Sequence, residues 1–248
     1  TVREWYQERL DIADAIVDTF GDEGLFDAEI LLCCAMSALA ARIWPGERID
    51  RFRYVQLFVD FAPDPAEVKR ISVPRLHEKL KAKKEEIASA QVLESRFLAG
   101  LEDRVLTGPE IDQSEQTLTA LLPAISLGRL REASYAAILY QDLRCGLVHE
   151  YSLPPHMIDF GLSRRQDVPS YVNVMATPNL EGEVMISGEL SADELETELL
   201  SSESTKRLYL PYRYVRRLSL NVAGGVFAYW DTASEWCRPI PQPWWFVR

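Results

Sequence analysis

The feature that most constrains the fold is a long apolar segment. Residues 30–41 are apolar except for Ser37. The segment is too short to span a bilayer, which takes about 20 residues, so we predict a buried helix over residues 26–44 that ends at Pro45 and Gly46. A chain of 248 residues is long enough to bury such a helix without disulfides or metals.

Helical spacing elsewhere predicts a mainly α fold. Apolar residues recur at three- and four-residue steps in residues 2–20, and Gly21 suits the end of that helix. The same pattern predicts further helices over residues 50–61, 72–98, 112–122 and 126–151. We therefore expect a helical domain over residues 1–155, closed by Pro154 and Pro155.

The pattern changes after Pro155. Residues 171–176 alternate as a β-strand does, and residues 183–187 are expected to return as its hairpin partner. A capping box at residues 191–194 predicts a helix to about residue 200, and a polar loop follows over residues 201–205. A last helix is expected over residues 212–230. We therefore predict a smaller α+β extension over residues 156–248, packed on the helical domain.

The charge and the cysteine content limit the possible functions. A net charge of −11 excludes bulk, non-specific nucleic-acid binding and leaves room for a small basic site. The chain has four cysteines and three histidines without paired ligand spacing, so no metal and no cofactor are expected. The free cysteines and the lack of an apolar leader at residues 1–10 favour a cytoplasmic protein with no membrane segment.

One segment carries candidate chemistry. Arg144 is followed after four intervening residues by His149, near the end of the predicted helix 126–151. RNA carries its own nucleophile, the 2′-hydroxyl, and a neutral histidine can remove that proton. An arginine can stabilise the charge that develops on the phosphate oxygens. Arg144 and His149 are therefore the candidate catalytic pair if the substrate is RNA, as the resemblance described next implies.

The Arg-x4-His spacing resembles the R-x4-6-H signature of HEPN-like domains. The resemblance extends to the apolar helix 31–44, to Pro45 and Gly46, and to residues 50–53. It covers about residues 25–155 and implies a helical bundle. It also implies an RNA-directed protein of toxin or defence type, cleaving without metal to a 2′,3′-cyclic phosphate and a 5′-hydroxyl. A homodimer with a composite site and an antitoxin protein as partner are further implications.

Helix geometry suggests roles for the neighbouring residues. Residues five apart on an α-helix are separated by about 140°, so Arg144 and His149 are not expected to share a face without a long reach or a second subunit. Asp142 lies within about 20° of His149 and is expected to orient the imidazole, as a third catalytic residue. Glu150 and Tyr151, which follow directly, are candidate substrate-binding residues.

Other readings remain open at this point. Residues 209–217 interleave tyrosines with arginines, and Arg213 and Arg216 would suit single-stranded RNA, although a solvated helix start with half-buried tyrosines is the favoured explanation. Arg70 and His77 also fit the motif, but Pro74 lies between them. The alternative reading places the Arg144–His149 pair in a structural ion-pair network and makes the chain a non-catalytic helical module that binds a protein or nucleic acid. No P-loop, G-x-G-x-x-G, G-x-S-x-G or H-E-x-x-H motif is present.

Overall fold

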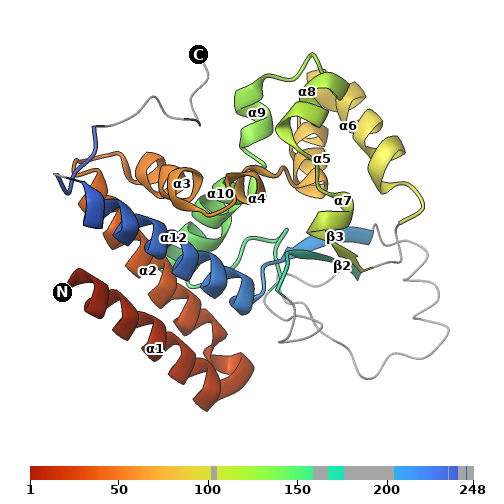
Figure 1. Cartoon of the computed structure of the whole chain (residues 1–248). Helices are drawn as coiled ribbons and strands as arrows, with labels where there is room; N and C mark the ends of the chain where they lie inside the picture. Colours follow the sequence, from red (N-terminus) through yellow and green to blue (C-terminus); the bar gives the residue numbers. More distant parts are fainter. Residues whose placement is uncertain (102–104, 159–166, 176–203, 234, 240–243, 245–248) are drawn as a thin grey trace.

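The computed structural model describes residues 1–101, 105–158, 167–175, 204–233, 235–239 and 244. Within these residues the chain is mainly helical and carries one small antiparallel sheet, as the sequence predicts. Figure 1 shows two groups of helices, with the sheet below the second group.

The first group contains the longest helices. They are α1 (Val2–Phe20), α2 (Leu25–Ile43), α3 (Asp50–Phe61) and α12 (Tyr212–Thr232), with the 3-10 turn η1 (Gly21–Gly24) between α1 and α2. α2 packs against α1, α3 and α12, and α1, α2 and α12 run side by side (Figure 1). Thr1 begins α1 with a capping box, in which its side chain accepts from the Glu4 backbone N–H at 3.2 Å. The predicted bounds of α1 and α3 are confirmed, and α2 lies within one residue of its prediction.

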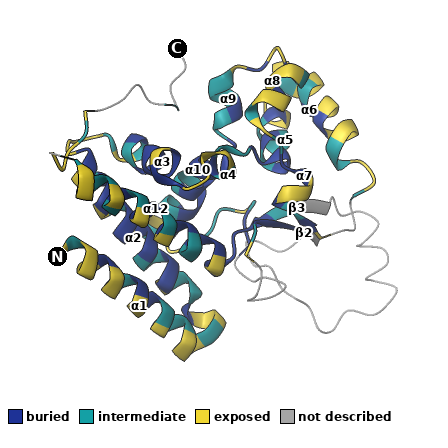
Figure 2. Cartoon of the chain, in the orientation of Figure 1, coloured by how far each residue is buried: buried dark blue, intermediate teal, exposed yellow. Residues whose placement is uncertain are grey.

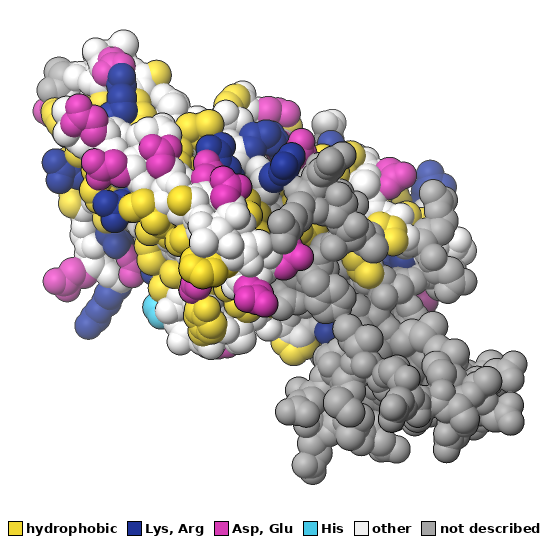
Figure 3. All heavy atoms as spheres, turned by 90° about the horizontal axis from the view of Figure 1, so that it is seen from below, with side chains coloured by type: hydrophobic (Ala, Val, Ile, Leu, Met, Phe, Trp, Pro, Cys, Tyr) yellow, Lys and Arg dark blue, Asp and Glu magenta, His cyan; other side chains and the backbone are white. Residues whose placement is uncertain are grey.

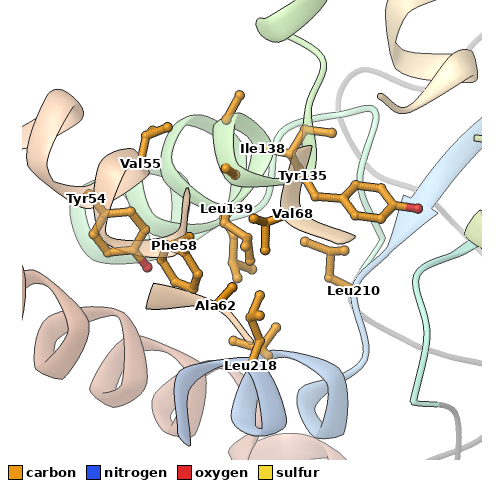
Figure 4. Close-up of a cluster of buried hydrophobic side chains, with 14 of the residues drawn as sticks. Tyr54, Val55, Phe58, Ala62, Val68, Tyr135, Ile138, Leu139, Leu210 and Leu218 are labelled. Atoms are coloured by element: carbon orange, nitrogen blue, oxygen red, sulfur yellow. The ribbon is translucent and has the colours of Figure 1, made fainter. Parts of the chain in front are cut away.

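The core runs from the first group of helices to the sheet. Nine of the 19 residues of α2 are buried, and exposed residues follow the outer side of α1 (Figure 2). In Figure 4, Tyr54 and Phe58 of α3 lie in one cluster with Leu139 and with Leu218 of α12. The core therefore draws on residues from both sides of the expected boundary at residue 155.

The second group consists of short helices. They are α4 (Pro65–Lys69), α5 (Val73–Lys81), η2 (Lys84–Glu86), α6 (Ile87–Leu93), η3 (Glu94–Leu98), α7 (Gly108–Ile111), α8 (Glu115–Leu121) and α9 (Leu127–Arg131). The single helix expected over residues 72–98 is wrong, because Lys83 is extended and separates α5 from η2. The helix expected from residue 112 begins at Glu115 instead, where Ser114 accepts from the Thr117 N–H at 3.1 Å.

The helix expected over residues 126–151 is also interrupted. Ser134 is extended, with φ −71° and ψ 156°, and it caps a new helix, α10 (Tyr135–Ile138). This helix continues into two π-helical segments, η4 (Leu139–Arg144) and η5 (Gly146–Glu150). The Arg-x4-His motif therefore lies on π-helical backbone.

The sheet has three antiparallel strands in the order β1-β2-β3. They are β1 (Leu106–Thr107), β2 (Ser170–Met175) and β3 (Ser204–Tyr209), and Tyr171 of β2 is opposite both Leu106 and Leu208. The strand expected at residues 171–176 is confirmed, shifted by one residue. Its expected partner at 183–187 and the helix from 191 lie outside the described residues. The polar loop expected over 201–205 is wrong at its end, because Ser204 and Thr205 pair with β2.

One helical stretch passes a length and composition test for a membrane span. This stretch covers Val2–Ile43. In the 18-residue part of it that is apolar enough to pass, 56% is buried inside the fold. A core helix passes the same test, so this finding is weak evidence in either direction.

Candidate functional site

The structure brings the two residues of the motif into direct contact. Arg144 Nη1 lies 2.7 Å from His149 Nε2. A guanidinium can only donate hydrogen bonds, so the imidazole Nε2 must be the acceptor and carries no proton in this arrangement. The His149 side chain is exposed and Arg144 is half-buried. The pair therefore offers an unprotonated imidazole nitrogen and a fixed guanidinium at the surface.

The π-helical backbone explains this contact. The Cys145 N–H donates to the Tyr140 carbonyl, and the Tyr151 N–H donates to the Gly146 carbonyl, each across five residues. This wider winding brings residues that are five apart close to each other, and Arg144 and His149 have that spacing. The expectation that the two do not share a face was wrong, because it assumed α-helical rotation.

Tyr140 and Cys145 form the support of Arg144. The Arg144 guanidinium carbon lies 5.6 Å from the centre of the Tyr140 ring, within cation–π range. Its Nη1 also lies 3.9 Å from Cys145 Sγ, a weak acceptor. Neither contact neutralises the guanidinium, so the full positive charge of Arg144 stays at the site.

Tyr151 lies directly after the motif and is fixed in place. Its backbone is left-handed, with φ 50°, which is rare for a residue with a side chain. Its hydroxyl donates to Asp27 Oδ1 at 2.9 Å, and its ring meets Phe26 edge-on at 6.0 Å. The ring is nevertheless 58% exposed. Tyr151 is therefore held against α2, two residues after His149 in the chain, and Glu150 between them is exposed.

The structure corrects the role expected for Asp142. Asp142 is buried, and its Oδ2 lies 3.0 Å from His156 Nε2 and 3.5 Å from Arg75 Nε. In the described part of the chain its ion pairs are with these two residues, and the hydrogen bond of the His149 ring is with Arg144. On π-helical backbone Asp142 and His149 no longer share a face. No sequence pattern predicted the contact between Asp142 and His156, which lies beyond the left-handed turn at Tyr151.

The two arginines expected to bind substrate have different surroundings. Arg216 makes a bidentate ion pair with Asp14 of α1. Its Nε and Nη2 donate to Asp14 Oδ1 and Oδ2, each at 2.5 Å. Arg213 is exposed and lines a hollow with Asp18 and Tyr209. The structure records no contact between either arginine and the Arg144–His149 pair within the described residues.

A second buried carboxylate was missed by the sequence analysis. Asp112 accepts hydrogen bonds from the Val73 N–H at 2.9 Å, from the Tyr171 hydroxyl at 2.7 Å, and from the Tyr135 hydroxyl. Burial raises the pKa of Asp112 to about 7, against the opposing effect of these hydrogen bonds. The cluster joins α5, α10 and β2, so it serves the fold, and no local pattern connects its members.

The described residues contain no group of three or more His, Cys, Asp or Glu placed to hold a metal ion. Cys33, Cys34, Cys145 and Cys237 are free thiols. Comparisons with protein-family models, with curated proteins and with solved structures give no match. The residues of the site therefore carry the functional argument by themselves.

Proposed function

We propose that this chain is an HEPN-like, metal-independent endoribonuclease of toxin or defence type, with Arg144 and His149 as its catalytic pair. The observation that carries the proposal is the 2.7 Å contact between the guanidinium and the unprotonated Nε2 of an exposed imidazole. The proposal includes a cytoplasmic protein, a homodimer and an antitoxin protein as partner.

The chemistry uses the two groups in turn. A phosphodiester that binds at Arg144 takes over the guanidinium donor that His149 Nε2 accepts in the free protein. The released nitrogen can then accept the proton of the 2′-hydroxyl as that oxygen attacks the phosphorus. Arg144 stabilises the charge that develops on the phosphate oxygens. The leaving 5′-oxygen takes a proton from solvent water and departs as a 5′-hydroxyl, and a 2′,3′-cyclic phosphate remains.

The charge distribution supports a local site. Figure 3 views the molecule from the side of α1, and acidic, basic and hydrophobic side chains are interspersed there without a continuous basic surface among the described residues. With a net charge of −11, affinity for RNA must come from a few fixed contacts. Tyr151, which is exposed, held by Asp27 and two residues after His149 in the chain, can add base stacking to these contacts.

One observation favours a second candidate, a non-catalytic helical module that binds a protein or nucleic acid. The carboxylate expected to orient His149 pairs with His156 instead. A histidine base without an orienting group is a weaker catalyst.

The test compares RNA cleavage by purified wild type and by three variants in the presence of EDTA. We expect wild type to leave 2′,3′-cyclic phosphate ends, and His149→Ala and Arg144→Ala to lower the rate at least about 100-fold. His77→Ala is the matched control, because His77 lies on α5 in contact with Glu94 at 3.7 Å and should leave the rate unchanged. Equal cleavage by wild type and His149→Ala would overturn the catalytic assignment, and no cleavage by any protein would favour the binding module.

A further inference from the structure

A hollow lies where the end of β3 and the start of α12 meet α1 and α2. Its volume is about 200 Å³. It is lined by Val17 and Asp18 of α1, Leu25 of α2, Tyr209 of β3, and Tyr212 and Arg213 of α12. A cavity of about 150 Å³ holds a benzene ring, so this hollow has room for the six-membered ring of a pyrimidine base.

Three polar groups that line the hollow are not used by the fold. Asp18 and Arg213 are exposed, and neither forms an ion pair or a side-chain hydrogen bond within the described part of the chain. Tyr209 is only 5% exposed, and among the described residues its hydroxyl has no hydrogen-bond partner. Buried tyrosine hydroxyls usually have such a partner, so an unfilled one beside a hollow indicates a ligand.

The protonation of Tyr209 fixes its role toward that ligand. Burial raises the pKa of Tyr209 to about 12, so the hydroxyl keeps its proton at neutral pH and can donate a hydrogen bond. The hydroxyl of Tyr212 is already engaged, because it donates to Asp14 Oδ1 at 2.9 Å. The hollow therefore presents one hydroxyl donor, the acceptor oxygens of Asp18 and the cation of Arg213.

Cytosine matches this set of groups. Its exocyclic amino group donates to a carboxylate, which is the contact that aspartate and glutamate make with this base. Its ring carbonyl accepts, as the Tyr209 hydroxyl requires. Uracil has a carbonyl oxygen in place of the amino group, so the oxygens of Asp18 would face another acceptor. Arg213 suits the phosphate of the same nucleotide, because its planar fork of N–H groups matches two phosphate oxygens.

The first turn of α2 connects the hollow with the catalytic pair. Leu25 lines the hollow, and the next two residues hold Tyr151: the Phe26 ring meets it edge-on at 6.0 Å, and Asp27 accepts from its hydroxyl at 2.9 Å. Tyr151 follows His149 by two residues. A strand that passes over the exposed Tyr151 ring can therefore place a base in the hollow.

We propose that the hollow binds one cytosine base of a single-stranded RNA, with Asp18 accepting from the amino group, Tyr209 donating to the ring carbonyl and Arg213 binding the phosphate. This inference rests on the proposed function and deepens it, because it adds a base preference to the RNA substrate. The three residues select and position the strand and take no part in proton transfer.

The experiment compares binding of single-stranded 2′-O-methyl hexacytidylate and hexauridylate by fluorescence anisotropy. These probes lack the attacking hydroxyl, so binding is measured apart from cleavage. We expect wild type to bind the cytosine probe about tenfold more tightly. Asp18→Asn should bring the ratio of the two affinities close to one, because an amide can donate to the uracil carbonyl as well as accept from the cytosine amino group.

Arg213→Gln tests the phosphate contact. It should weaken binding of both probes by the same factor and leave their ratio unchanged. It should also reduce the slope of log K against log salt by about 0.7, the value for one lost phosphate contact on a single strand.

Asp11→Asn is the matched control, because it removes the same charge from α1 at a residue that accepts from Gln7 at 2.8 Å and does not line the hollow. Thermal unfolding of each variant checks that the fold is kept. Equal binding of the two probes by wild type overturns the inference and leaves the proposed function standing. A ratio that Asp18→Asn keeps at the wild-type value overturns it as well. If wild type binds neither probe, the inference fails, and RNA cleavage by wild type against His149→Ala decides the proposed function separately.

Discussion

An arginine and a histidine lie at each of two faces of the π-helical segment, in opposite settings. On one face, Arg144 and His149 contact each other at 2.7 Å and the imidazole is exposed. On the other face, His156 and Arg75 lie against the buried carboxylate of Asp142. The arginine and the histidine of the buried face lie within 3.5 Å of one carboxylate. Those of the exposed face contact each other and the Tyr140–Cys145 unit in the described structure.

This difference separates a structural role from a functional one. A buried ion-pair cluster uses its charges to join elements, here α5, η4 and the segment after Tyr151. Donors at the surface without a carboxylate can bind an anion that comes from outside. The same residue types therefore predict opposite consequences of mutation on the two faces.

The largest expected effect is on the buried face. Asp142→Ala leaves His156 without its carboxylate and Arg75 with Glu78 alone, and we expect it to lower the free energy of unfolding by about 3–5 kcal/mol. His149→Ala removes an exposed side chain and should change this free energy by less than about 0.5 kcal/mol. Urea unfolding of both variants measures the difference. If the two variants are equally stable, Asp142 has no structural role and the comparison between the faces fails.

The second buried carboxylate predicts a pH dependence. Burial raises the pKa of Asp112 to about 7 in the folded chain, above the ordinary value of 3.8 for this side chain. The folded protein therefore keeps a proton that the unfolded chain has lost between about pH 4 and pH 7. The stability from this group is fully present below about pH 4 and is lost as the pH rises through about 7. Across this window the loss is on the order of 2–4 kcal/mol.

Asp112→Asn removes this titration. The difference in unfolding free energy between wild type and the variant, measured by urea unfolding at several pH values, isolates it from all other groups. We expect wild type to lose stability relative to the variant from pH 4 to pH 7. A constant difference over this range would show that Asp112 titrates alike in the folded and unfolded chains.

The smallest expected effect is at the turn that links the two faces. A Cβ on Gly146 would lie 2.5 Å from the Ser152 carbonyl oxygen and 3.5 Å from Pro154 Cδ. Gly146→Ala must therefore displace the segment that runs from His149 to His156, at a cost of about 1–3 kcal/mol. Gly224→Ala on α12 is the control, because nothing lies within 4 Å of its added Cβ and alanine favours a helix. Thermal unfolding should show opposite shifts, and equal shifts would contradict the close approach.

Periodicity predicted the long helices well, because each buries one continuous apolar stripe. The bounds of α1 and α3 follow from it directly. The breaks after α5 and α9 were not predictable in this way, because helical spacing continues through them. Extended backbone at Lys83 and at Ser134 interrupts the helices there. At Ser134 the reason is tertiary, since Ile71 forms an isolated β-bridge with it.

The candidate site was predictable in its residues and not in its geometry. The spacing of Arg144 and His149 is visible in the sequence, but no sequence signal indicates π-helical winding. Assigning α-helical rotation to the segment gave Asp142 the wrong partner. The contact between Asp142 and His156 follows the left-handed turn at Tyr151. A tyrosine in the sequence does not predict left-handed backbone.

The position of α12 has a consequence for biogenesis. This helix spans Tyr212–Thr232 and packs between helices made from the first quarter of the chain. Because synthesis proceeds from the N-terminus, α2 and α3 emerge from the ribosome long before their last neighbour. Their apolar faces stay uncovered until residues 212–232 have also been made. A nascent chain that stalls before this helix therefore cannot complete the core.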